Sequence, residues 1–137
     1  MKDHFDLTDF EFEQKFETSS LDAGLFSHEA HLRLAWIHIT KYGIDKALEN
    51  IQLQLKAYVK HLGAASKYNK TVTIAAVKAV YHFILKSKSD NFQDFIVEFP
   101  RLKNNLKGLM DSHYGIDIFN SEAAKKEYLR PDLLPFD

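Results

Sequence analysis

Three histidines in one segment are the side chains of this sequence best suited to chemistry. His28, His31 and His38 lie in a stretch that is predicted to be helical. At about 100° of rotation per residue they fall within roughly 80° of one another. Leu32 and Ala35 share that face, so we expect it to face the interior. A histidine stripe on an inward face indicates either a polar site or a core in which the imidazoles make structural hydrogen bonds.

His28 and His31 are the candidates for catalysis, for binding a small ligand and for binding a metal ion. Helical neighbours at i and i+3 bring two imidazoles within reach of one ligand. The sequence here is His-Glu-Ala-His, which is not the H-E-x-x-H arrangement of metalloproteases. No metal is assigned and the sequence requires no cofactor, because a third metal ligand would have to come from elsewhere: His61, His82, Glu17 or Asp22.

A second group of polar residues stands where a later helix is expected to begin. Tyr68, Asn69 and Thr71 precede or open a helix expected at about residues 70–87. If this loop meets the start of the histidine helix, two helix N-termini offer free backbone N–H groups to an anionic ligand. We therefore predict that Tyr68, Asn69 and Thr71 complete a ligand-binding site with His28 and His31.

The alternative is that the same side chains are structural. A buried, hydrogen-bonded histidine cluster would fix the contacts between helices. Asn69 is a favourable N-cap, and a tyrosine in the position of Tyr68 usually packs its ring and bonds its hydroxyl group. Thr71 suits a capping position or the edge of a core. The residue types alone leave both interpretations open.

The scarcity of helix breakers predicts an all-α fold. The chain has five glycines and three prolines, and its apolar residues recur at helical spacing. We expect residues 1–137 to form one compact domain, a bundle of five to seven mostly short helices. The expected elements are an acidic N-terminal helix at about 8–19, helices at about 28–42, 45–62 and 70–87, a fifth capped by Asp90, a sixth containing Leu102 to Met110, a short one from Ser121 to about Tyr128, and an extended tail at about 129–137.

Composition narrows the class of protein further. The absence of cysteine removes disulfides, thiolate ligands and a cysteine nucleophile. No run approaches the ~20 apolar residues that span a bilayer, so a membrane is not expected as a partner. The first residues lack the basic-then-apolar layout of a signal peptide. These features favour a cytoplasmic protein.

Charge is distributed unevenly along the chain. Residues 1–29 contain eight acidic residues and two lysines, whereas residues 52–88 contain seven lysines and no acidic residue. A basic surface attracts nucleic acid or phosphorylated ligands. This stretch contains no arginine, however, and its aromatic residues have core-like spacing. We therefore expect the acidic N-terminal helix to dock near the lysine-rich helices, and we do not expect nucleic acid as a partner.

Two neighbours of the histidines are expected to be structural. Glu29 and Arg33 stand at i and i+4, which predicts an ion pair on the solvated side of the helix, worth little to stability. Trp36 is the only tryptophan, and a lone tryptophan on a helix is typical of packing.

Three blocks of residues resemble a family of small, uncharacterised bacterial all-α proteins. They are Phe26-Ser27-His28-x-x-His31-Leu32-Arg33-x-Ala35-Trp36, Lys67-Tyr68-Asn69-x-Thr71-x-Thr73, and Ser121-x-x-Ala124 followed by Arg130-Pro131-Asp132-Leu133. The resemblance covers the chain from about residue 25 onward. It implies a helical domain with a shared polar cluster and no particular reaction.

The chain departs from that family at Asn69, where the similar proteins have histidine in a Tyr-His-x-Thr pattern. If that histidine is an essential ligand or base, the activity of this protein is altered. If it only caps a helix and forms hydrogen bonds, Asn69 does the same.

The leading functional hypothesis is a small-molecule or anion-binding helical domain with a polar histidine site, in which His28 or His31 performs acid–base chemistry. The alternative is a helical protein-interaction module or homodimer whose histidines are structural. A mononuclear metal-binding protein is third. A concave pocket to which both imidazoles are exposed favours the first hypothesis, whereas buried imidazoles with an external apolar patch favour the second.

Overall fold

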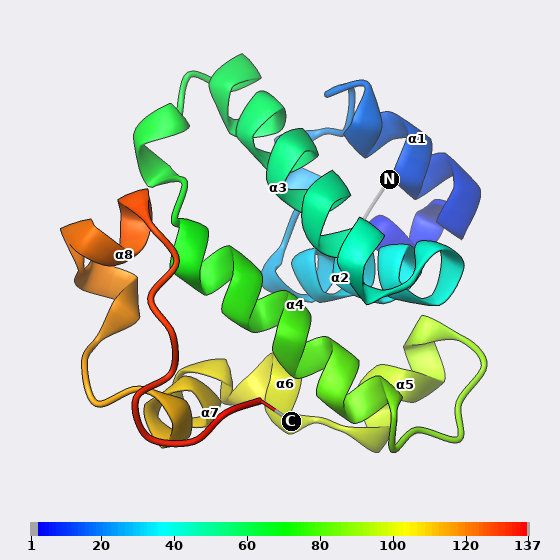
Figure 1. Cartoon of the computed structure of the whole chain (residues 1–137). Coiled ribbons are helices and arrows are strands. Elements are labelled where there is room, and N and C mark those ends of the chain that lie inside the picture. The colour runs from blue at the N-terminus through cyan, green and yellow to red at the C-terminus, as the bar shows by residue number, and fades with distance from the viewer. Residues whose placement is uncertain (1–2, 137) are drawn as a thin grey trace. The chain divides into compact units, whose positions relative to one another are not determined.

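The computed structural model describes residues 3–136, which form helices and irregular segments and no β-strand (Figure 1). Eight α-helices lie within this range, so the all-α prediction is confirmed. The contacts divide the chain into two units, Met1–Tyr68 and Asn69–Asp137. Within residues 3–136 no helix combines the length and the apolar character needed to cross a membrane.

The first unit is built from three α-helices. These are α1 (Asp9–Glu17), α2 (His28–Tyr42) and α3 (Ile44–His61), with 3₁₀ turns η1 (His4–Asp6), η2 (Ala23–Leu25) and η3 (Ala65–Lys67) between or beside them. Side-chain caps define two of the starts: Thr8 accepts from the amide of Glu11, and Ser27 accepts from the amide of Ala30. Gly43, at φ 86°, separates α2 from α3, because a left-handed residue ends one helix and lets the chain turn directly into the next.

An aromatic cluster joins the helices of the first unit. Phe16 of α1 is fully buried, and its ring centroid lies 4.9 Å from that of Tyr58 on α3 and 4.9 Å from that of Phe26. The Tyr58 hydroxyl donates to the carbonyl oxygen of Leu21 at 2.9 Å, so its polar end is satisfied inside the core. These contacts hold the loop before α2, where the candidate histidines begin.

The second unit surrounds one long helix. It contains α4 (Lys70–Ile84), α5 (Phe92–Glu98), α6 (Arg101–Asn104), α7 (Leu106–His113), η4 (Ile118–Asn120) and α8 (Glu122–Lys126). The sixth helix expected from the sequence is divided at Asn105. The side chain of Asn105 accepts from the amide of Gly108 and so starts α7 as a new helix. The cap of α5 is Asn91 rather than the expected Asp90.

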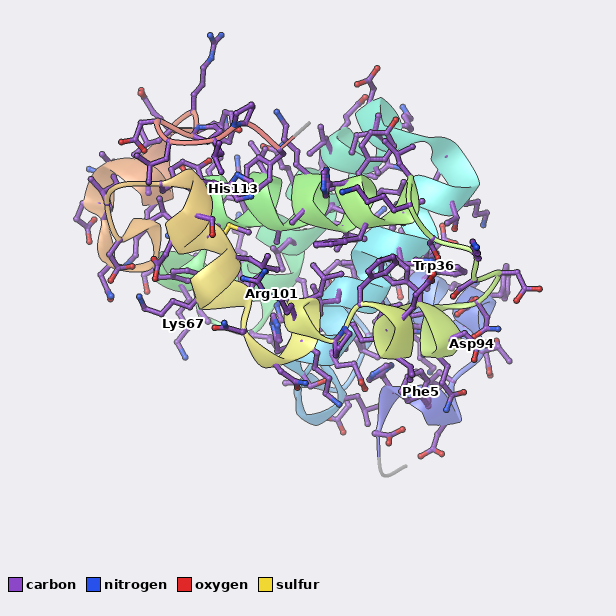
Figure 2. All side chains as sticks on the ribbon, turned by 90° about the horizontal axis from the view of Figure 1, so that it is seen from below. Phe5, Trp36, Lys67, Asp94, Arg101 and His113 are labelled. Carbon is purple, nitrogen blue, oxygen red and sulfur yellow. The ribbon has the colours of Figure 1, made fainter. Side chains whose placement is uncertain are left out.

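The last ten described residues contain no helix, as expected for the tail. Its backbone is fixed to the end of α7, because the amide of Leu133 donates to the carbonyl oxygen of His113 at 2.9 Å. The His113 ring, labelled beside the tail in Figure 2, stacks on Phe136 with centroids 4.1 Å apart. Phe136 is buried by this contact. The tail is therefore part of the second unit's packed structure.

Candidate functional site

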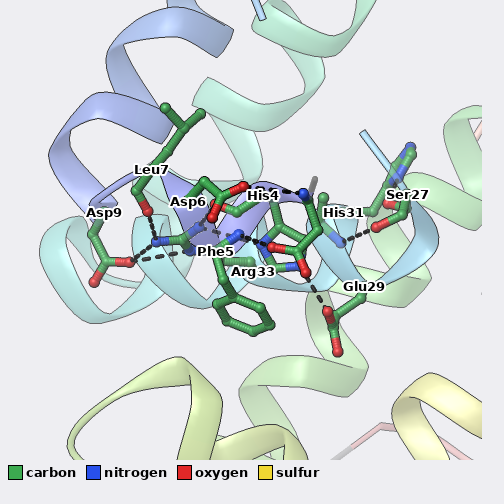
Figure 3. A network of polar contacts seen from close by, with 11 residues as sticks. His4, Phe5, Asp6, Leu7, Asp9, Ser27, Glu29, His31 and Arg33 are labelled. Carbon is green, nitrogen blue, oxygen red and sulfur yellow. Dashed lines mark hydrogen bonds and ion pairs between the residues drawn. The ribbon is translucent and has the colours of Figure 1, made fainter. Parts of the chain in front are cut away.

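His31 is held in a defined orientation in the first turn of α2. Its ring stacks on Phe26 with centroids 3.7 Å apart and planes 23° apart. Its Nδ1 atom lies 2.8 Å from the carbonyl oxygen of Ser27 (Figure 3). A carbonyl oxygen can only accept, so Nδ1 carries the hydrogen and donates it. The neutral ring therefore presents its lone pair at Nε2.

The surroundings of His31 also favour the neutral form. The residue reaches solvent, but enough of its ring is packed against protein that desolvation lowers its pKa below the usual 6.5. The hydrogen bond to Ser27 acts in the opposite direction, and the charge of His28 lowers the pKa of His31 further. At neutral pH the imidazole is consequently a hydrogen-bond and proton acceptor.

His28 is exposed at the first position of α2. The expectation that all three histidines of this helix face inward is therefore correct only for His38, which is fully buried. Within residues 3–136 no group of three or more histidine, cysteine, aspartate or glutamate side chains could hold a metal ion. No third ligand therefore joins His28 and His31 among these residues.

Tyr68 is the last residue of the first unit. It follows η3, is half-buried, and has the Lys56 ammonium group 5.3 Å from its ring centroid. A lysine over a tyrosine face is a cation–π contact. The ring of Tyr68 thus packs against Lys56 within the first unit.

Asn69 and Thr71 belong to the second unit and use their polar atoms within it. The Oδ1 atom of Asn69 accepts from the amide of Val72 at 2.9 Å, and its Nδ2 atom donates to the carbonyl oxygen of Ile118 at 2.8 Å. Thr71 is fully buried; its hydroxyl donates to the carbonyl oxygen of Glu127 at 2.7 Å and accepts from the amide of Leu129 at 3.0 Å. The five predicted ligand-binding residues are therefore divided between two units, three in the first and two in the second.

Replacing Asn69 with alanine is expected to lower the free energy of unfolding by about 2 kcal/mol, because a helix cap and a partner of the Ile118 carbonyl are lost together. Chemical denaturation followed by circular dichroism measures this. Asn91→Ala is the matched control, since Asn91 caps α5 from an exposed position, and we expect about 1 kcal/mol there. Equal effects in the two variants would show that the bond to Ile118 contributes nothing.

Arg33 corrects the prediction of a surface ion pair with Glu29. Its side chain is buried, and its guanidinium group binds Asp9 instead, with Nη2 2.8 Å and Nε 3.2 Å from one carboxylate oxygen (Figure 3). It also donates to the carbonyl oxygens of His4 and Leu7. The prediction was wrong because the N-terminal segment 3–9 lies over this face of α2 and covers it.

His4 and Glu29 complete this polar network. His4 is 1% exposed, and its Nε2 atom lies 2.8 Å from a carboxylate oxygen of Glu29. Its Nδ1 atom lies 3.2 Å from Nη1 of Arg33. Arginine can only donate, so Nδ1 accepts and the Nε2 hydrogen is donated to Glu29. Sequence reasoning missed this arrangement because the partners are 25 and 29 residues apart and share no periodicity.

His38 lies in a second polar cluster that the sequence did not reveal. Glu13, which is buried on α1, accepts from Lys41 at 2.9 Å and from the hydroxyl of Tyr42. Burial acts to raise the pKa of Glu13, but these two hydrogen bonds and the charges of Lys41 and His38 together outweigh it, so the pKa lies below its usual value. His38 Nδ1 has a long 3.5 Å contact with Nδ2 of Asn50 on α3.

The His38 environment predicts a pH-dependent stability. Desolvation lowers the pKa of His38, and the charge of Glu13 only partly opposes this, while Lys41 adds to the lowering. The unfolded chain therefore binds a proton near pH 6.5 that the folded protein takes up only at lower pH. Above about pH 6.5 neutral His38 makes its full contribution to stability. This contribution is lost as the pH falls from about 6.5 toward the lower pKa that His38 has in the folded protein.

We expect the loss of stability between about pH 7.5 and about pH 5.5 to be smaller in His38→Gln than in the wild type. Urea denaturation at both pH values measures the difference. His61→Gln, which removes an exposed histidine from the same unit, should retain the wild-type pH dependence. The assignment to His38 is wrong if both variants lose stability as steeply as the wild type.

No family model, curated protein or solved structure matches the chain. The resemblance to the bacterial all-α family thus stays an expectation from the three sequence blocks. The function of this protein must therefore be inferred from the geometry of its two units.

Proposed function

We propose that the first unit binds a small molecule at the start of α2, with His31 as the recognising group and His28 as a second, accessible imidazole. The observation that carries this proposal is the 2.8 Å hydrogen bond between His31 Nδ1 and the Ser27 carbonyl. This bond, together with the stacking on Phe26, fixes both the ring orientation and the tautomer. Because a neutral imidazole carries a single ring hydrogen, donation from Nδ1 leaves the outer Nε2 nitrogen as an acceptor.

The tautomer also favours one class of ligand. An Nε2 lone pair accepts a hydrogen bond, so it suits a hydroxyl, amide or ammonium group better than an anion. The same nitrogen can remove a proton from a bound hydroxyl group, since a neutral imidazole oriented by a carbonyl has the arrangement of a general base. We therefore favour a hydrogen-bond-donating small molecule over the anionic ligand that the sequence also allowed.

Two further parts of the proposal come from the sequence alone. The cysteine-free composition favours a cytoplasmic protein. The three sequence blocks favour a relationship to the small bacterial all-α proteins, whose shared polar cluster would include His28 and His31.

Nitrogen-15 NMR of the histidine side chains tests the basis of the proposal. We expect His31 to show a protonated Nδ1 and an unprotonated Nε2 at neutral pH. The opposite tautomer would contradict the geometry on which the proposal rests. His61 provides an exposed reference in the same spectrum.

Ligand binding is tested with phenol, ethylene glycol and methylammonium as hydrogen-bond donors, and with acetate and inorganic phosphate as anions. We expect a donor to shift the His31 ring signals of the wild type and of His61→Gln, and acetate and phosphate to have weaker effects. Donor-induced shifts at neighbouring residues should disappear in His31→Gln. The proposal fails if no donor shifts the His31 signals, or if His31→Gln responds as the wild type does.

A further inference from the structure

The acidic charge of the first unit is only partly neutralised within that unit. The acidic residues between 1 and 29 that form ion pairs do so with residues of α2 or of the N-terminal segment: Asp9 with Arg33, Glu13 with Lys41, and Glu29 with His4. Of the lysine-rich helices near which α1 was expected to dock, α3 is in contact with it, since Phe16 packs on Tyr58. No ion pair among residues 3–136, however, joins α1 to the lysines of α3.

The outer face of α3 is basic with an apolar centre. It consists of five exposed residues at spacings of three and four: Lys46, Glu49, Leu53, Lys56 and Lys60. Leu53 is 68% exposed, and Lys46 and Glu49 pair with each other at 3.6 Å. Lys56 and Lys60 form no ion pair with any residue from 3 to 136, so the second half of this face keeps two positive charges beside an exposed leucine.

The outer face of α1 has the complementary character. Phe10, Gln14 and Glu17 follow one another at spacings of four and three, and all three are exposed. Phe10 is 66% exposed, which is unusual for so large an apolar side chain. Glu11 lies beside this face, where its carboxylate completes the N-terminal capping box with Thr8. Glu17 forms no ion pair within the described part of the chain, residues 3–136.

We infer that the outer face of α1 in one copy of the chain docks on the outer face of α3 in a second copy. Phe10 would cover Leu53, and Glu17 would lie against Lys56 or Lys60. The α3 face lacks arginine and has Leu53 at its centre, and both features fit an apolar and acidic helix better than a nucleic acid. Because the two surfaces differ, copies pair one face of each kind, and the association closes as a reciprocal dimer or a ring or continues as an open chain.

Two single helix faces bury less than the roughly 1,600 Å² of a standard stable interface, so the association should be weak. Its charged pairs lie near solvent, where a Debye length of about 10 Å at 0.1 M salt screens them. None of these residues belongs to the proposed His31 site, so the two proposals stand or fall separately.

Sedimentation velocity of the full chain at increasing protein concentration tests the association, at about 20 mM and about 500 mM NaCl. We expect the mean sedimentation coefficient to rise with concentration at low salt and to return to the monomer value at high salt. A chain that is monomeric at every concentration and at both salt levels overturns the inference.

Charge reversal identifies the two faces. Lys56→Glu/Lys60→Glu makes the α3 face acidic, and Gln14→Lys/Glu17→Lys makes the α1 face basic while leaving the capping box of Glu11 intact. Each variant alone should remain monomeric, whereas an equimolar mixture should associate again, because the altered faces attract each other.

Lys86→Glu/Lys88→Glu is the matched control for net charge in the second unit and should associate as the wild type does. Circular dichroism confirms that each variant is folded. A mixture that stays monomeric, or a control that also fails to associate, contradicts the inference.

Discussion

Replacing Arg33 with methionine is expected to lower the free energy of unfolding by about 3 kcal/mol. Methionine keeps much of the volume beneath Phe12 but removes the guanidinium donor to the carbonyl oxygen of Leu7 and to two acceptors of His4. These are its Nδ1 atom and its carbonyl oxygen, which keeps the amide of Leu7 at 3.2 Å. It also removes the cationic partner of Asp9, whose side chain is 53% exposed and can regain water. The acceptors of His4 and Leu7 therefore account for more of the loss than the ion pair does.

Urea denaturation, followed by circular dichroism and by the fluorescence of Trp36, measures the effect of Arg33→Met. Arg130→Met is the matched control, because Arg130 is exposed, and its effect should stay within about 0.5 kcal/mol. Arg33→Lys should be nearly as unstable as Arg33→Met, since one ammonium group cannot reach the four acceptors that the guanidinium fork binds. An Arg33→Met variant as stable as the control would show that the N-terminal segment does not depend on this side chain.

Replacing Thr71 with valine is expected to lower the free energy of unfolding by about 2 kcal/mol. Valine fills the same space, so packing is preserved and only the hydroxyl group is lost. That group is both the donor to the Glu127 carbonyl and the acceptor for the Leu129 amide. One substitution thus leaves two backbone groups without a partner at the point where the tail leaves α8.

Amide hydrogen exchange gives the Thr71→Val experiment a local readout. The Leu129 amide should exchange faster in the variant, because its acceptor is gone. Thr73→Val is the control on the same helix: the Thr73 hydroxyl donates only to the Asn69 carbonyl, which already accepts the α4 backbone amide of Thr73. The structural role of Thr71 is excluded if Leu129 exchange and overall stability remain those of the wild type.

Features that depend on residues close in the chain could be predicted from the sequence. Thr8, Ser27 and Ser121 cap helices that begin close to the expected positions, and such starts are predictable because an N-cap bonds an amide only three residues ahead. The start of α7 at Asn105 was missed, although it also depends on a local cap, because the spacing of the leucines favoured one continuous helix. Local signals therefore compete, and periodicity outweighed capping in that prediction.

The site required contacts between distant segments. The sequence identified His28 and His31 as candidates on one turn of α2, but it predicted that they face inward and did not show that the Ser27 carbonyl selects the His31 tautomer. It placed Arg33 at the surface, since nothing in the chain between Thr8 and Arg33 indicates that the N-terminal segment returns to cover α2. Asn69 and Thr71 looked suitable for a ligand and instead bond the backbone of residues 118–129.

The sequence by itself determined that this protein is all-α, where most of its helices start, and which turn carries the paired imidazoles. Hydrophobic periodicity and capping specify these features because they act over three or four residues. Only the tertiary structure decided which polar side chains remain available. Burial depends on segments that come together only in the folded protein. It sets the pKa of His31 and His38 and the partners of Arg33, and it does not follow from the spacing of residues along the chain.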